Sequence, residues 1–549
     1  MRARRTASAV RSGDSRRRWL KLAASLAATA PLPLRGQPGR DPGRPLVVVN
    51  ARVHAAHPAG NGATALAVEA GRISMLGSDA ALLGLRPAGA RVIDAGGRWL
   101  VPGLCDLEAD LLSAGLAYTR TLRWDGAGSL PVALARLREH AAGLPAGAWV
   151  VVEGASPRVD AWLSGLDDGA IDIAAGGRPV LVVTAPGQGR INPPAARRLG
   201  LDPGAGLALS GMAAQAAHAH ALGAARDSAE RDASVERLGR QYARFGVTTL
   251  VDIGEAAYPD DYASLVRLNA AGRLPVRVAC FLATNDARRE AADLAQWSSV
   301  PFAGQGDRWL QLLGARIRAT EAGAIDSALL ALARARWAWR IEAADAQALD
   351  GVLLAVDRLR ERQSIDRLRW VVDIAREPDT TAMNALRRLG GGVCLSPVRL
   401  PGDAAPGLVD RLVEHGVPIG LGGGGSRRAG LDPWRMVDWL APTLQGGDAD
   451  RLREARLAAL ARVAAGNAWA LDAEGVAGAL APGRPADFAI LDHDPFVASP
   501  ARQASRLTVA GGRVTWADGP FAEFAPASLA RLPPGSSVDR LPPYPGRTR

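Results

Sequence analysis

Short β-branched runs alternate with amphipathic stretches through the middle of this chain of 549 residues. Runs such as "GVTTLVDIG" and "LPVRVACFLA" predict buried strands, whereas "DSALLALARARWAW" and "DGVLLAVDRLRERQ" have the spacing of amphipathic helices. The alternation covers residues 101–476 and begins with the strand-like runs "GAWVVVEG" and "RPVLVVTA". Repeated β then α over this length predicts an α/β protein with a TIM-like (β/α)8 barrel, whose functional groups lie at the carboxyl ends of the strands.

Two flanking segments have a different pattern, with short alternating strands that turn at glycines. Residues 45–100 contain "PLVVVNARVHAA" and "RVIDAGGRWLVPGL", and residues 477–519 contain "PADFAILDHDPF" and "SRLTVAGGRVTWADG". Because these segments enclose the barrel region, we expect them to combine into one small composite β domain.

The two ends of the chain have the patterns of processing and linker segments. Residues 1–35 include "SRRRWLKLAASLAATAPLPL", in which paired arginines precede an apolar run, typical of a twin-arginine export signal. That run is shorter than the roughly 20 residues of a spanning helix. We therefore expect export to an extracytoplasmic, periplasmic location and no integral membrane segment beyond the signal. Residues 520–549 are proline-rich and predict a flexible tail.

Charge and cysteine content narrow the classes of partner. The formal net charge is +11, and Lys21 is the only lysine among 66 cationic residues. Many arginines lie beside acids in helix-like stretches, which indicates a solvated surface rather than nucleic-acid binding. The three cysteines, Cys105, Cys280 and Cys394, stand far apart in apolar runs, so we expect buried thiols and no disulfide framework.

A set of motifs spread from Pro45 to Trp516 carries a family resemblance. "VIDAGGRWLVPGLCD", "GVTTLVDIG", "ALAPGRPADFAILDHDPF" and "LTVAGGRVTW" together resemble the amidohydrolase superfamily, in the amidohydrolase family 3 branch of formamide deformylases and D-aminoacylases. The resemblance implies a TIM barrel with a composite β-sandwich. It also implies hydrolysis of non-peptide C–N bonds by water activated on a divalent metal, usually zinc.

The metal-ligand positions implied by the resemblance carry other residues here. The motif P-G-L-x-D-x-H-x-H becomes "PGLCDLEAD", which retains Asp106 but changes both histidines. A further family histidine aligns with Gln188. Another family histidine aligns with Val372, or with Asp373 if the alignment shifts by one residue. The former ligand positions are Glu108, Asp110, Gln311 (the carboxylated lysine), Glu342, Val372 and Gly424. We therefore predict no metal cofactor and a pseudoenzyme with a binding or vestigial role.

Three acids are the candidate catalytic residues if activity remains: Glu108, Asp110 and Glu342. Residues two apart on a strand share a face, so Glu108 and Asp110 should both point into the barrel mouth with Glu342. Converging carboxylates repel one another and need compensation. Three alternatives supply it: pairing with arginines; a hard cation such as Ca²⁺, Mg²⁺ or Mn²⁺; or metal-free acid/base chemistry. For the first we consider three arginines, Arg316, Arg318 and Arg340.

Two further motifs have simpler interpretations. His218 and His220 lie in a predicted helix, where residues two apart point in different directions, so they indicate a surface pair rather than a metal site. "GLGGGGS" lacks the lysine of a phosphate-binding loop and predicts a flexible turn in place of a metal-bearing one. A small-molecule ligand in the barrel mouth is the partner that we expect, and the sequence leaves the oligomeric state open.

Overall fold

The computed structural model describes most of the chain between residues 44 and 526. The twin-arginine segment and almost all of the proline-rich tail lie outside the described residues. The described ranges are 44–57, 62–125, 127, 129–154, 168–185, 188–203, 208–222, 227–254, 261–284, 289–299, 305–318, 322–400, 405–426, 430–441, 449–473, 478–497 and 503–526.

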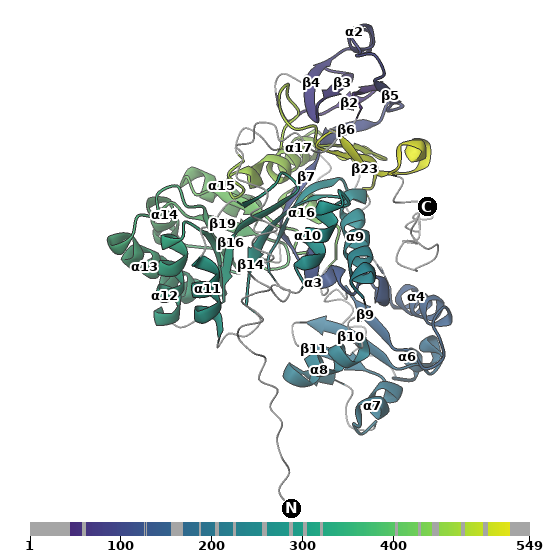
Figure 1. The fold of residues 1–549 in the computed structure, drawn as a ribbon, viewed down its shortest axis with the longest axis vertical. Coiled ribbons are helices and arrows are strands. Elements are labelled where there is room, and N and C mark those ends of the chain that lie inside the picture. Colours follow the sequence, from purple (N-terminus) through teal and green to yellow (C-terminus); the bar gives the residue numbers. More distant parts are fainter. Residues whose placement is uncertain are drawn as a thin grey trace, which may run out of the picture.

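Within the described residues, eight parallel strands of the nine-stranded central sheet almost close into a barrel, and the ninth, β15 (Gln305–Gly306), is a short antiparallel strand beside them (Figure 1). The closure is made by an isolated bridge between Ala109, at the end of the first strand, and Gly425, in the glycine run after the last strand, where the Asp110 amide donates to the Gly425 carbonyl at 2.9 Å. The predicted TIM-like barrel is thereby confirmed. In sheet order the strands are β7 (Leu104–Ala109), β13 (Val247–Asp252), β14 (Arg277–Leu282), β16 (Leu310–Ile317), β17 (Ala338–Ala343), β18 (Trp370–Ile374), β19 (Gly392–Leu395) and β20 (Ile419–Leu421).

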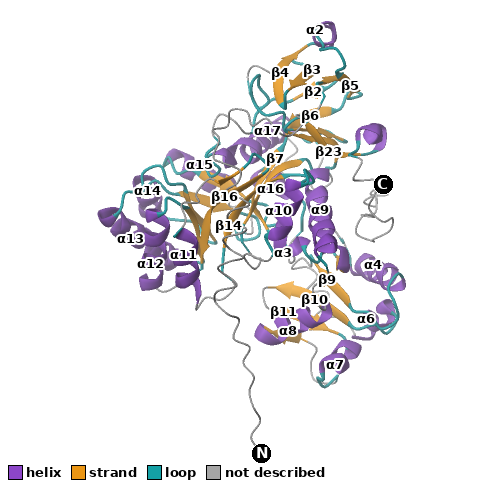
Figure 2. Cartoon of the chain, in the orientation of Figure 1, coloured by secondary structure: helices purple, strands orange, loops and turns teal. Residues whose placement is uncertain are grey.

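Amphipathic helices cover the outside of this barrel (Figure 2). In α13 (Ala346–Arg362), Asp345 caps the first turn, and Leu349, Val352 and Val356 are buried on one face. No helix within the described ranges is long and apolar enough to span a bilayer. The other covering helices are α9 (Ser228–Arg244), α10 (Ala263–Ala270), α11 (Glu290–Ser298), α12 (Ala322–Arg334), α14 (Thr380–Leu389), α15 (Ala405–Glu414), α16 (Trp434–Leu440) and α17 (Ala449–Ala465).

The flanking segments form the expected composite β domain, built as two packed sheets. One sheet has the order β4-β3-β1-β5, and the other has the order β2-β6-β21-β22-β23. Side chains from both sheets, among them Val48, Leu66, Phe488 and Val509, share one apolar core. The strands are β1 (Leu46–Val49), β2 (Arg52–Val53), β3 (Ala65–Glu69), β4 (Arg72–Gly77), β5 (Arg91–Asp94), β6 (Trp99–Pro102), β21 (Phe488–Leu491), β22 (Ser505–Ala510) and β23 (Arg513–Ala517).

A separate five-stranded sheet corrects the assignment of two strand-like runs. "GAWVVVEG" and "RPVLVVTA" form β9 and β10 of this sheet and do not enter the barrel. They have their own core against α4 and α6, which includes Val150 and Val182. The inserted sheet has the strands β8 (Thr121–Arg123), β9 (Val150–Glu153), β10 (Val180–Ala185), β11 (Gln188–Ile191) and β12 (Ala208–Ser210), with helices α4 (Leu130–Ala142), α6 (Asp168–Ala175), α7 (Pro193–Leu199) and α8 (Gly211–Leu222).

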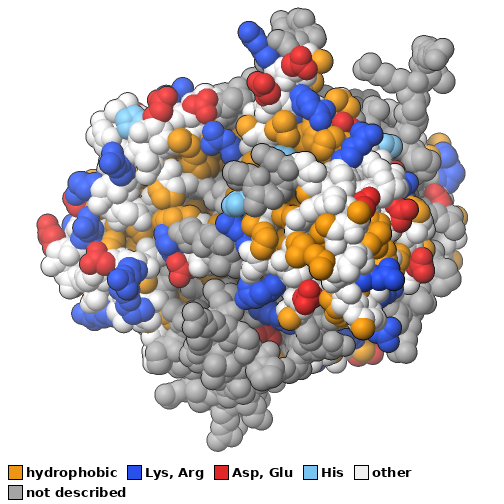
Figure 3. All heavy atoms as spheres, turned by 90° about the horizontal axis from the view of Figure 1, so that it is seen from above, with side chains coloured by type: hydrophobic (Ala, Val, Ile, Leu, Met, Phe, Trp, Pro, Cys, Tyr) orange, Lys and Arg blue, Asp and Glu red, His pale blue; other side chains and the backbone are white. Residues whose placement is uncertain are grey.

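Basic and acidic side chains are mixed on the surface seen in Figure 3, and the three cysteines are buried. Figure 3 shows blue basic side chains spread over one face and interspersed with red acidic ones. Cys105, Cys280 and Cys394 are all buried and free, as the apolar runs around them predicted.

Candidate functional site: an arginine-carboxylate network at the barrel mouth

The end of β7 places two buried carboxylates against the last strand of the barrel. Asp106 and Glu108 are each more than nine-tenths buried. Asp106 Oδ1 accepts hydrogen bonds from the Glu108 amide at 3.0 Å and from the Gly423 amide at 2.7 Å. Asp106 is therefore held by backbone donors from both sides of the barrel closure.

The glycine run after β20 packs closely on these acids. A Cβ on Gly422 would lie 2.3 Å from Glu108 Cβ, and one on Gly423 would lie 2.6 Å from Asp106 Oδ2. Gly424 has a φ of 64°, which disfavours any residue with a side chain. Where the sequence predicted a flexible turn, the structure shows a turn that needs glycine because it contacts β7 so closely.

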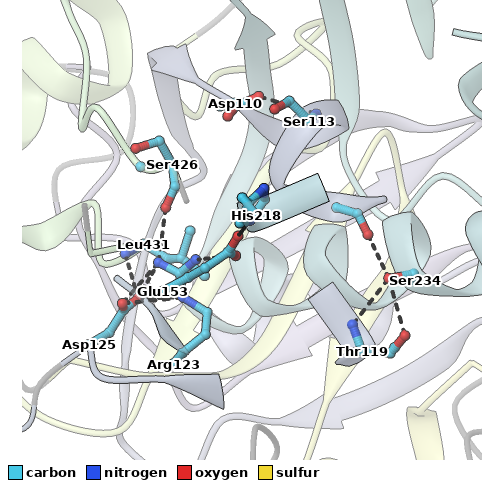
Figure 4. A network of polar contacts seen from close by, with 12 residues as sticks. Asp110, Ser113, Thr119, Arg123, Asp125, Glu153, His218, Ser234, Ser426 and Leu431 are labelled. Atoms are coloured by element: carbon cyan, nitrogen blue, oxygen red, sulfur yellow. Dashed lines mark hydrogen bonds and ion pairs between the residues drawn. The ribbon is translucent and has the colours of Figure 1, made fainter. Parts of the chain in front are cut away.

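Asp110 has a different role from Glu108. The strand ends at Ala109, and Asp110 caps helix α3 (Leu111–Gly115), with its Oδ1 accepting from the Ser113 amide at 3.2 Å (Figure 4). The alternation that puts residues two apart on one face holds only within a strand. The structure therefore does not present Glu108 and Asp110 as a matched pair on one strand.

Arg399, from the loop after β19, connects Glu108 and Glu342. Its Nε donates to Glu108 Oε1 at 2.8 Å, and its Nη1 lies 2.7 Å from Glu342 Oε1. Two of the three predicted acids thus meet at one guanidinium. Glu108 and Glu342 come from strands on different sides of the barrel, so this ion-pair network spans its mouth.

Arg316 completes the contacts of Glu342 from the neighbouring strand. Its Nη2 donates to Glu342 Oε2 at 2.8 Å, and its side chain is only 5% exposed. Arg318 takes no part in this pairing: its amide donates to Glu290 Oε1 and its Nη2 to the Gly254 carbonyl.

Arg340 fills the barrel interior below this network. Its Nε donates to Asp373 Oδ2 at 2.8 Å, its Nη1 to the Leu107 carbonyl, and its Nη2 to Cys394 Sγ at 3.2 Å. Arg340 and Asp373 are both almost completely buried. This pair ties β17 to β18, β19 and β7 across the interior.

The remaining former ligand positions lie elsewhere. Gln311 stands at the start of β16, paired with Ala279, whereas Arg316 lies near the carboxyl end of that strand. Val372 belongs to the large outer core, and its neighbour Asp373 is the residue that contacts Arg340. Gln188 begins β11 in the inserted sheet and is exposed.

Burial and pairing shift the buried aspartates in opposite directions. Burial raises the pKa of Asp106 to about 6, although the amides of Glu108 and Gly423 favour its charged form. Burial also opposes ionisation of Asp373, but the charge and hydrogen bonds of Arg340 outweigh it and lower the pKa of that carboxyl. Burial disfavours charged Arg399, yet Glu108, Asp373 and Glu342 raise its pKa.

Sequence reasoning missed Arg399 and a second polar network at the inserted sheet. Arg399 lies in the irregular run Ser-Pro-Val-Arg after β19, and no periodic pattern marks it. An inspection of charged residues just beyond each barrel strand would have found it.

The second network joins the inserted sheet to a barrel loop (Figure 4). Arg123 pairs with Asp125 at 2.9 Å and donates to the Ser426 carbonyl, just beyond the glycine turn. His218 Nε2 lies 3.2 Å from the fully buried Glu153. The helix predicted around His218 is confirmed as α8, but His218 is a half-buried partner of Glu153 rather than one of two surface histidines.

The fold and the site together define the class of protein. It is an α/β barrel with a composite β-sandwich and a polar mouth at the carboxyl ends of the barrel strands. A family model described as "Amidohydrolase family" matches residues 91–516, and the chain belongs to that family. A search of curated proteins finds no match.

Solved structures give the same fold. An uncharacterized metal-dependent hydrolase from Pyrococcus furiosus is 15% identical with a TM-score of 0.59, and the match covers 82% of this chain and all of that one. A second such hydrolase, from Pyrococcus horikoshii, is 16% identical with a TM-score of 0.59, over 83% of this chain and 99% of that one. At these identities the likeness concerns the fold alone.

Proposed function

We propose that this amidohydrolase-family protein has no zinc hydrolase activity and that its barrel mouth binds a small molecule without catalysing its hydrolysis. The observation that carries the proposal is Arg399, which binds Glu108 and Glu342 together. A guanidinium in contact with both acids occupies them with two charge-assisted interactions.

The donor set at the mouth supports the proposal because it does not fit a zinc centre. Zinc in proteins takes nitrogen and sulfur ligands with some carboxylates. Here the acids bind guanidinium groups, and Val372 and Gly424 carry no donor side chain. The two buried arginines of the mouth, Arg316 and Arg340, and the largely buried Arg399 would repel a divalent cation. Among the described residues, no group of three or more metal-binding side chains is assembled.

Metal analysis with an activity screen tests this proposal directly. We expect the purified full chain to carry no stoichiometric divalent ion and to leave N-formyl and N-acetyl amides intact, with or without added Zn²⁺, Mn²⁺ or Mg²⁺. Hydrolysis that increases with one of these ions, or a stoichiometric bound ion, would overturn it.

A second candidate is metal-free acid/base hydrolysis at the same mouth, by Glu108 and Glu342 together with the neighbouring Asp106. It is favoured by the pKa of about 6 at Asp106, which lies beside Glu108 in sequence and structure. In this case the screen detects metal-independent hydrolysis, and Glu108→Gln abolishes it. Activity that survives both Glu108→Gln and Glu342→Gln excludes this candidate.

A further inference from the structure

The ion pairs around Glu342 are unequal in their exposure. The side chains of Arg316 and Arg399 are 5% and 14% exposed, whereas the Glu342 side chain is 44% exposed. The two cations are thus fixed in the wall of the mouth, and the anion between them faces solvent.

Each oxygen of the Glu342 carboxylate binds one of the two arginines. Oε2 accepts from Arg316 Nη2 at 2.8 Å, and Oε1 lies 2.7 Å from Arg399 Nη1. If Glu342 swings into solvent, Arg399 stays in place because its Nε remains bound to Glu108. A ligand carboxylate could then make the same two contacts, which match the charge-assisted geometry that arginines offer.

Glu108 supplies a second recognition element beside this position. Its Oε1 binds Arg399, but its buried Oε2 has no hydrogen-bond partner among the described residues. A buried acceptor without a donor is costly. A hydroxyl or N–H group carried by the ligand next to its carboxylate would satisfy it.

We infer that the barrel mouth binds a small organic carboxylate with an adjacent hydrogen-bond donor, and that Glu342 is an internal competitor which this ligand displaces. The inference rests on the proposed non-catalytic binding role and adds the chemical class of the ligand. A protein whose site is filled by its own side chain binds with reduced apparent affinity, so removal of that side chain should strengthen binding.

Titration calorimetry with glycolate tests the inference, with acetate and glycolamide as controls for the donor and the carboxylate. We expect Glu342→Gln to bind glycolate about tenfold more tightly than the native protein does. Acetate should bind more weakly than glycolate, and glycolamide should not bind. Glu342→Ala, which also removes the competing carboxylate, should reproduce the gain if the glutamine variant folds poorly.

Two further variants test whether the gain in glycolate affinity arises at the barrel mouth. Asp357→Asn removes a carboxylate of similar exposure, 46%, which pairs with Arg388 on the helical surface, and it should leave glycolate binding unchanged. In the double variant Glu342→Gln with Arg316→Gln, the gain should disappear because one of the two guanidiniums is gone.

Several results would overturn the inference. These are an absence of glycolate binding by folded Glu342→Gln and Glu342→Ala, an equal gain in Asp357→Asn, or tighter binding of inorganic phosphate than of glycolate. Equal affinities for acetate and glycolate would show that Glu108 does not accept a hydrogen bond from the ligand. Metal-stimulated hydrolysis would instead overturn the proposed function, whether or not carboxylates bind.

Discussion

Two aspartates on barrel strands, Asp106 on β7 and Asp373 on β18, are equally buried but differently compensated. Asp106 accepts from two backbone amides, and burial raises its pKa to about 6. Asp373 binds the guanidinium of Arg340, and its pKa is lowered in spite of burial. Partial backbone dipoles do not offset the desolvation of a carboxylate, whereas a full positive charge does.

This difference shows what the arginines contribute to the fold. Buried Arg340 and the largely buried Arg399 each contact a buried acid from another part of the barrel, so their removal leaves a charge without compensation. The mouth is consequently a stabilised polar structure as well as a candidate binding site.

The largest effect is expected at Arg340. Arg340→Gln leaves Asp373 buried without its cation and should lower the free energy of unfolding by about 3–5 kcal/mol. Urea denaturation at neutral pH measures this loss. The double variant with Asp373→Asn should recover much of it. Arg358→Gln, which breaks a solvent-exposed ion pair with Asp326, should barely move the midpoint. Equal stability of Arg340→Gln and the native protein would contradict the structural role of the pair.

Arg399 should show a smaller loss because Glu342, one of its two partners, is partly exposed. Arg399→Gln leaves Glu108 buried without its donor, so we expect a loss of about 2 kcal/mol in the same denaturation experiment. Adding Glu108→Gln removes the uncompensated charge and should restore part of the stability. A double variant less stable than Arg399→Gln would show that Glu108 does not depend on this contact.

Because of Asp106, acidification should stabilise the folded protein. A salt-bridged acid has the opposite effect, since its lowered pKa makes acidification destabilising. The Asp106 pKa of about 6 in the folded protein exceeds the ordinary value near 3.9, so the folded state binds the proton more tightly. Acidification from pH 7 to pH 5 should therefore stabilise the native protein by about 1 kcal/mol relative to Asp106→Asn.

The comparison with Asp106→Asn isolates this group. Burial also raises the pKa of Asp432, to about 8, but that contribution is common to both proteins and cancels. Asp373, whose pKa is lowered, stays ionised between pH 7 and pH 5 in both the folded and the unfolded chain. It therefore adds no pH dependence to the free energy of unfolding over this range. Parallel pH profiles for the two proteins would contradict the raised pKa of Asp106.

The barrel and the composite β domain were predictable because periodicity reports burial along each strand. The assignment of β9 and β10 was wrong because a β/α repeat looks the same in an inserted sheet and in a barrel. Which strands become neighbours depends on contacts between distant segments, which a local pattern does not contain.

The candidate site was predictable in part. Glu108 and Glu342 do meet, as the strand alignment implied, but Asp110 leaves the strand to cap a helix. An aspartate directly before "LLSAG" is itself an N-cap signal that favoured this outcome. Arg399 was unpredictable from periodicity because it comes from an irregular loop whose position depends on the closed barrel.

The smallest effect on stability is expected for Glu342→Gln. This variant shows whether Glu342 contributes to folding or competes with a ligand for the mouth. Because the Glu342 side chain is 44% exposed, its ion pairs are weakened by solvent, and Glu342→Gln should change the free energy of unfolding by less than about 1 kcal/mol. The same variant should gain affinity for glycolate, whereas Arg399→Gln should lose stability and binding together. If Glu342→Gln is instead as destabilising as Arg340→Gln in urea denaturation, Glu342 is a structural acid like Asp373 and not a displaceable competitor.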